Sequence, residues 1–150
     1  RWAAYLSAYA ANGAAAVNAR DRIGAGPWYN AKGVKVAESV DALHADMMTL
    51  TKDTALDEKG AVVNGRGDTP NQHDILTGST ADGRVDGMNT CANWTSEATM
   101  GVAATVGHHD RQGGGAAPTS WNAAHQTSGC SAAGLVSTGG AGRFYCFATN

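Results

Sequence analysis

Short apolar runs separated by long polar, glycine-rich stretches dominate the hydrophobic pattern of the chain. The runs whose apolar or alternating character is typical of brief strands cover 33–37, 75–79, 91–95 and 143–148. Helical spacing is weak and confined to an alanine-rich run at 14–23 and to residues 40–48, for which Ser39 is the expected N-cap. These elements predict an α+β fold with one or two helices and long irregular loops.

The second half of the chain is predicted to consist mostly of loops. Almost no helical periodicity is present after Ser96, and Gly113–Gly115 predicts a flexible hinge. The chain shows neither an internal repeat nor a linker that would divide it, so we expect residues 1–150 to form a single domain.

Composition predicts an unusual core and excludes two classes of protein. Large aliphatic residues are scarce, whereas the chain has four Trp, four Tyr and 20 Gly, so we expect a core of aromatic residues and alanine. A net charge of −2 is not that of a nucleic-acid binder, which needs a basic surface. No apolar run approaches the roughly 18 residues of a membrane span. We therefore expect a globular domain that neither binds nucleic acid nor crosses a membrane.

Several short motifs occur in an order that resembles a known family. They are RWAAYLS, GPW, ILTGSTADG, CANWTS, SWNAAH, GCS and GRFYCFA, between residues 1 and 148. In this order they resemble bacterial secreted domains with an endostatin-like, C-type-lectin-like fold, a group that includes leptospiral endostatin-like surface proteins. The resemblance implies a C-type-lectin-like fold with a small twisted antiparallel sheet.

The resemblance also accounts for the odd number of cysteines. It implies an inner disulfide between Cys91 and Cys130, and it places Cys146 in an outer disulfide whose partner lies outside this sequence. The domain would then be N-terminally incomplete, and an open sheet edge would allow a homo-oligomer to form. The aromatic residues around Cys146 predict a last strand that is buried on both faces. Disulfides indicate an extracellular or cell-surface location.

The function that the resemblance implies is binding. We expect a secreted or cell-surface, non-enzymatic adhesion module that recognises extracellular matrix proteins, host proteins or glycans. A structural subunit of an extracellular homo-oligomeric or filamentous assembly is the alternative. The sequence has no Gly-x-Ser-x-Gly elbow, no His-Glu-x-x-His motif and no phosphate-binding loop, so we predict no catalytic residue.

One candidate binding segment resembles part of a lectin site. Trp121-Asn122 precedes Cys130 as a Trp-Asn-Asp motif precedes a cysteine in calcium-dependent lectins, and Asp82 is a further candidate. Ala123 replaces the aspartate of that motif, so we expect no required cofactor, with Ca²⁺ as the alternative. Core packing of Trp121 is the other interpretation of this segment.

A second candidate binding segment is the tripeptide Arg66-Gly67-Asp68, which matches the sequence that integrins bind on exposed loops. Because Asp68 precedes a Thr-Pro pair, its side chain could instead close a turn on nearby backbone N–H groups. Both interpretations stay open at this stage.

Histidine and aspartate gather in two short clusters. These are His73-Asp74 and His108-His109-Asp110, with His125 as a further member. Imidazole and carboxylate groups bind Zn²⁺, but we expect them here mainly to satisfy one another in a structural network. Neighbouring residues of an extended chain point to opposite sides, so His108 and His109 would not share one ion. The candidate metal ligands are Asp68, Asp74, Asp82, His108 and Asp110.

Overall fold

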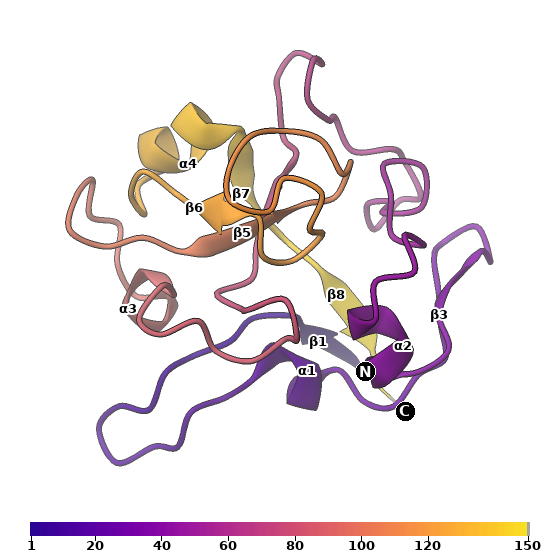
Figure 1. The fold of residues 1–150 in the computed structure, drawn as a ribbon, viewed down its shortest axis with the longest axis horizontal. Coiled ribbons are helices and arrows are strands. Elements are labelled where there is room, and N and C mark those ends of the chain that lie inside the picture. Colours follow the sequence, from indigo (N-terminus) through magenta and orange to yellow (C-terminus); the bar gives the residue numbers. More distant parts are fainter. Residues whose placement is uncertain (150) are drawn as a thin grey trace.

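The computed structural model describes residues 1–149 and consists of short strands and helices joined by long loops (Figure 1). The elements in chain order are β1 (Trp2–Ala4), α1 (Ala19–Arg22), β2 (Trp28–Tyr29), β3 (Lys35–Ala37), α2 (Val40–His44), β4 (Asp74–Leu76), α3 (Cys91–Trp94), β5 (Thr105–His108), β6 (His125–Gln126), α4 (Ala132–Thr138), β7 (Gly140–Phe144) and β8 (Cys146–Ala148). This content confirms the predicted α+β class.

The largest sheet is mixed, whereas a small antiparallel sheet was expected. Its strand order is β6-β5-β4-β7; β4 runs antiparallel to β5 and parallel to β7. The parallel pair arises because α4 leads directly into β7 and delivers it beside β4. Two further pairs, β1–β8 and β2–β3, are two-stranded. In Figure 1, β1 and β8 lie beside both ends of the chain, away from α4 and β6.

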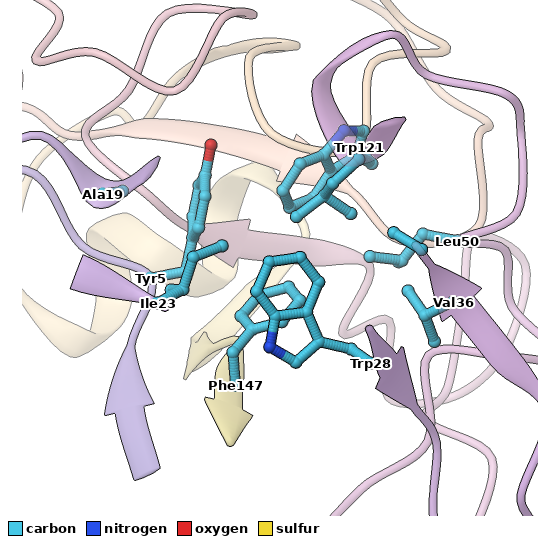
Figure 2. Packing of buried hydrophobic residues seen from close by; sticks show 10 residues of the cluster. Tyr5, Ala19, Ile23, Trp28, Val36, Leu50, Trp121 and Phe147 are labelled. Atoms are coloured by element: carbon cyan, nitrogen blue, oxygen red, sulfur yellow. The ribbon is translucent and has the colours of Figure 1, made fainter. Parts of the chain in front are cut away.

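The main core is aromatic, as the composition predicts. Trp28 and Phe147 meet edge to face, and Tyr5 packs against Trp121 with ring centroids 4.9 Å apart (Figure 2). Such ring contacts add about 0.5–1.5 kcal/mol each to the burial of apolar area. The apolar side chains that complete the cluster include Ile23, Val36, Leu43 and Leu50 from the first third of the chain. The core therefore joins β1 and β8 to β2, β3 and α2.

A disulfide holds a second, smaller cluster. Cys91 and Cys130 are bonded across a separation of 39 residues, as predicted, and pack with Ala104. A crosslink of this span stabilises the fold by about 3–4 kcal/mol in the chain-entropy model. Such a bond fits folding in an oxidising compartment.

The segment predicted as a strand at 91–95 is instead α3, a single left-handed turn. Its four residues have φ between 49° and 67°, which normally costs side-chain-bearing residues about 1–2 kcal/mol each. Tertiary contacts hold the turn: the Asn93 side chain bonds both backbone groups of Tyr9, and Trp94 Nε1 donates to the Ser7 carbonyl. The local sequence does not reveal these partners, which explains the error.

The last predicted strand also differs from expectation. The run at 143–148 breaks at Tyr145, because β7 joins the mixed sheet whereas β8 pairs with β1. In β8 only Phe147 is buried, so the prediction that this strand is buried on both faces is wrong. Cys146 faces outward as a free, exposed thiol.

Local sequence signals correctly predict where α2 begins, but they predict neither its end nor the helix α4. Ser39 caps α2 as predicted, because its hydroxyl accepts a hydrogen bond from the backbone N–H of Ala42, but the helix ends at His44. The helix α4 was not predicted, because its small and mixed residues give no apolar stripe. Ser131 caps this helix, and Gly139 ends it with φ of 109°.

Candidate metal centre

The strand register of the mixed sheet brings Asp74, His108 and His125 to one place. Asp74 of β4 lies directly opposite His108 of β5, and His125 of β6 lies opposite Val106. Residues 106 and 108 of one strand face the same side, so the three polar side chains share one face of the sheet. His73, which immediately precedes β4, supplies a third imidazole.

The three imidazoles converge on a single carboxylate oxygen. Asp74 Oδ1 lies 3.2 Å from His73 Nε2, 3.2 Å from His108 Nε2 and 3.5 Å from His125 Nε2. The Asp74 and His108 side chains are almost completely buried, and the His125 side chain is about one-fifth exposed. The rings of His73 and His108 are stacked with centroids 4.3 Å apart. A compact, largely dry cluster of one acid and three imidazoles results.

The other nitrogen of each ring fixes its tautomer. Each Nδ1 contacts an oxygen that can only accept a hydrogen bond, so each Nδ1 carries the proton. These oxygens are Oδ1 of Asp110 for His73, at 3.2 Å, the carbonyl of Pro118 for His108, at 2.7 Å, and the carbonyl of Gln126 for His125, at 3.0 Å. In the neutral rings, all three Nε2 atoms therefore present lone pairs to Asp74.

The centre of the cluster lacks hydrogen bonds. Neither carboxylate oxygen of Asp74 accepts one, and His108 Nε2 has no hydrogen-bond partner, although all three atoms are buried. Burial alone would raise the pKa of Asp74, but hydrogen bonds and charge from the imidazoles of His108 and His125, which require a proton on Nε2, lower it to about 2. Lone pairs facing an anion repel it unless a cation lies between them. Leaving such groups unpaired costs about 1–3 kcal/mol each.

The spacing fits a tetrahedral metal ion. Metal–ligand bonds of about 2.0–2.1 Å give tetrahedron edges of about 3.3–3.4 Å, close to the nitrogen–oxygen distances around Asp74. The ligand atoms of His73, Asp74 and His108 all lie within 4.8 Å of one another. Two imidazoles and one carboxylate suit Zn²⁺ and similar divalent transition metals. His125 lies at the edge of this set, on the side of the cluster that is partly exposed.

Contacts of the outer nitrogens match those that orient metal-binding histidines. In metal sites the non-ligating N–H usually donates to a carboxylate or a backbone carbonyl, as all three rings do here. Asp110 is fixed in turn, because it accepts hydrogen bonds from the backbone N–H groups of Arg66 and Gln112. These bonds hold the pKa of Asp110 below its usual range against the effect of burial. The imidazole of His73 is therefore held in one orientation.

Glycines allow the backbone to close around the rings. At Gly113, which has φ of 134°, an added Cβ would lie 2.6 Å from His108 Cε1 and 2.9 Å from His73 Cε1. At Gly139 it would lie 2.9 Å from His73 Nε2. The glycine run predicted as a hinge thus packs directly on the cluster.

The structure separates the predicted metal ligands. Asp74 and His108 lie in the cluster, whereas Asp110 contacts the outer nitrogen of His73 and is a positioning residue. Asp68 accepts hydrogen bonds from Lys52 and from the backbone N–H of Gly65, which closes the alternative turn. Asp82 bonds its near neighbours Thr80 and Arg84 on the surface. The structure therefore places Asp68, Asp82 and Asp110 outside the group of atoms that converge on Asp74 Oδ1.

The predicted lectin-like binding residues are part of the core. Trp121 and Asn122 are each 1% exposed. The Asn122 amide donates to the Tyr5 hydroxyl and to two backbone carbonyls, so it has no group free for a ligand. Their role is core packing, the alternative stated for this segment. Arg66 and Gly67 are exposed, and Arg66 lies beside the cluster.

His73 and His125 were predicted to belong to the histidine and aspartate clusters, but they were not among the predicted metal ligands. A useful signal was present for His73, which lies just before the predicted strand at 75–79, but no strand was predicted near His125. What the sequence lacks is the register that sets His125 beside His108 and Asp74. His109 is correctly separated from His108, since its Nε2 contacts the Asn64 carbonyl instead.

Comparison of the chain with models of known families, with curated proteins and with solved structures finds no match. Among the described residues, no helix has both the length and the apolar character needed to cross a bilayer. The case for function therefore depends on the cluster itself.

Proposed function

We propose that this chain is a metal-dependent binding module, with Zn²⁺ held by His73, Asp74 and His108 and accessible to a ligand. The observation that carries the proposal is the convergence of three imidazole Nε2 atoms on one buried carboxylate oxygen that accepts no hydrogen bond. A divalent cation at this point would satisfy all of these atoms at once. The structural network expected from the sequence is the weaker explanation, because it would leave the central atoms unpaired.

For the wider biological role we propose what the resemblance to secreted endostatin-like domains implies. The module would act outside the cell or at its surface as a non-enzymatic adhesion domain of C-type-lectin-like fold, for extracellular matrix proteins, host proteins or glycans. The disulfide between Cys91 and Cys130 supports an oxidising location. An integrin-type role of Asp68 has less support, since Lys52 and a backbone N–H already engage its carboxylate.

Calorimetric titration of EDTA-treated protein with ZnCl₂ tests the metal centre. We expect saturation at one ion per chain for the wild type and loss of binding in His108→Gln. His109→Gln is the matched control, because His109 is equally buried but lies outside the cluster, so this variant should still bind. Circular dichroism checks that both variants fold. Absence of saturable binding, or equal affinity in His108→Gln, would contradict the proposal.

A further inference from the structure

A cavity of about 420 Å³ adjoins the metal centre. Its volume lies within the range of about 300–1,000 Å³ that is usual for small-molecule sites. His73 and His125 form part of its wall, so the cavity reaches the cluster from the solvent side, whereas Asp74 and His108 lie beneath it. A metal ion at the cluster would face this space with any coordination position that the protein leaves open.

The cavity wall carries positive charge and hydrogen-bond donors. Arg66 is its one permanently charged lining residue, and no Asp or Glu of the described chain lines it. Among the described residues, the Arg66 guanidinium has no hydrogen-bond or ion-pair partner. Its backbone N–H donates to Asp110, which fixes the position of the loop beside the cluster. An anion would therefore meet a charged donor without a competing carboxylate.

The glycine wall adds backbone donors. In the described chain, the N–H groups of Gly113, Gly114 and Gly115 donate to no protein acceptor. Gly113 and Gly115 have φ of 134° and 105°, and a Cβ on Gly115 would lie 2.9 Å from both the Ala124 carbonyl oxygen and His125 Cβ. Only glycine fits here without strain, and successive free N–H groups of this kind bind anions in many proteins.

We infer that the cavity binds a small oxyanion, a carboxylate or a phosphate group, with one oxygen on the metal ion and another on the Arg66 guanidinium. A planar guanidinium recognises both anions through paired hydrogen bonds. The inference depends on the proposed metal centre and names the ligand chemistry of that same site. The anion would be the part of a larger extracellular ligand that the module recognises.

Visible spectroscopy of the Co²⁺-loaded protein, freed of unbound metal, tests this. Titration with sodium phosphate and, separately, sodium acetate should change the Co²⁺ absorption bands in a saturable manner, and the tighter of the two identifies the group. Arg66→Gln should weaken anion binding about tenfold or more while Co²⁺ affinity is unchanged. Arg84→Gln, which removes an exposed arginine that pairs with Asp82, is the matched control and should behave as wild type.

The outcomes separate the two proposals. Failure of the wild type to take up Co²⁺ would overturn the metal centre and this inference with it. Uptake of Co²⁺ with no spectral response to either anion, or with an equal response in Arg66→Gln, would overturn the oxyanion site alone.

Discussion

The aromatic core and the histidine cluster both bury polar side chains, but only the core pairs the groups at its centre. In the core, the Asn122 amide donates to the Tyr5 hydroxyl, which also lies 2.8 Å from His44 Nε2. The Tyr145 hydroxyl donates to the Trp121 carbonyl. In the cluster, both oxygens of Asp74 and the inner nitrogen of His108 are buried without a hydrogen bond.

This difference distinguishes residues that stabilise the fold from residues that await a ligand. A buried polar group without a partner destabilises a protein, so such groups are rare unless something else binds them. The core polar groups support the packing of rings from both ends of the chain. The cluster groups are aimed at one another in a way that a bound cation would satisfy. In this account, the groups that stabilise the fold and the proposed metal ligands occupy separate parts of the same small domain.

The largest effect should come from the core. Trp121→Ala removes a ring that is 1% exposed and packs against Tyr5 and Tyr145, so we expect unfolding in urea to show a loss of about 3–5 kcal/mol. Trp2→Ala is the matched control, because Trp2 is 73% exposed and its loss should cost less than about 0.5 kcal/mol. Equal costs for the two variants would contradict the described core.

A pair of polar substitutions sharpens the comparison in metal-free protein. Asn122→Ala leaves the buried Tyr5 hydroxyl and the carbonyls of Thr80 and Ala81 without this donor, so we expect a loss of about 2–3 kcal/mol. Asp74→Asn should leave stability unchanged or raise it, because it removes an unpaired charge and offers an N–H to the facing lone pairs. Both are measured by urea unfolding in EDTA. A large loss in Asp74→Asn would mean that the cluster is a structural network.

The smallest expected effect concerns the orientation of His73. Asp110→Asn weakens the contact with His73 Nδ1 and should lower Zn²⁺ affinity about 10–100-fold without abolishing binding, the usual effect of losing such a partner. Competition with a chelating dye measures this affinity. Asp82→Asn alters an exposed carboxylate outside the cluster and should leave it unchanged. If both variants bind as the wild type does, Asp110 has no positioning role.

Local signals predicted part of the fold. The alternation at 33–37 and the apolar run at 75–79 correspond to β3 and β4, and Ser39 caps a helix as expected. Elements fixed by distant contacts were missed: α3 depends on hydrogen bonds from Asn93 to Tyr9, far away in the sequence. The helix α4 was missed because its small residues give no periodic pattern.

The candidate site was predicted by residue type and missed in its geometry. Asp74 and His108 were among the expected ligands because they lie in the dense histidine and aspartate segments. The register between β4, β5 and β6 decides which of these side chains meet, and the sequence does not encode that register in any local pattern. The same register brings in His125, whereas Asp68 and Asp82 lie in loops outside the sheet.

X-ray absorption at the zinc edge of the Zn²⁺-loaded protein tests the central claim most directly. The account predicts a first shell of nitrogen and oxygen atoms at about 2.0–2.1 Å, with the outer scattering of at least two imidazoles, and its loss in Asp74→Asn. The competing ligand is the exposed thiol of Cys146. A sulfur scatterer at about 2.3 Å that disappears in Cys146→Ser, with no imidazole signal, would contradict a metal centre at His73, Asp74 and His108.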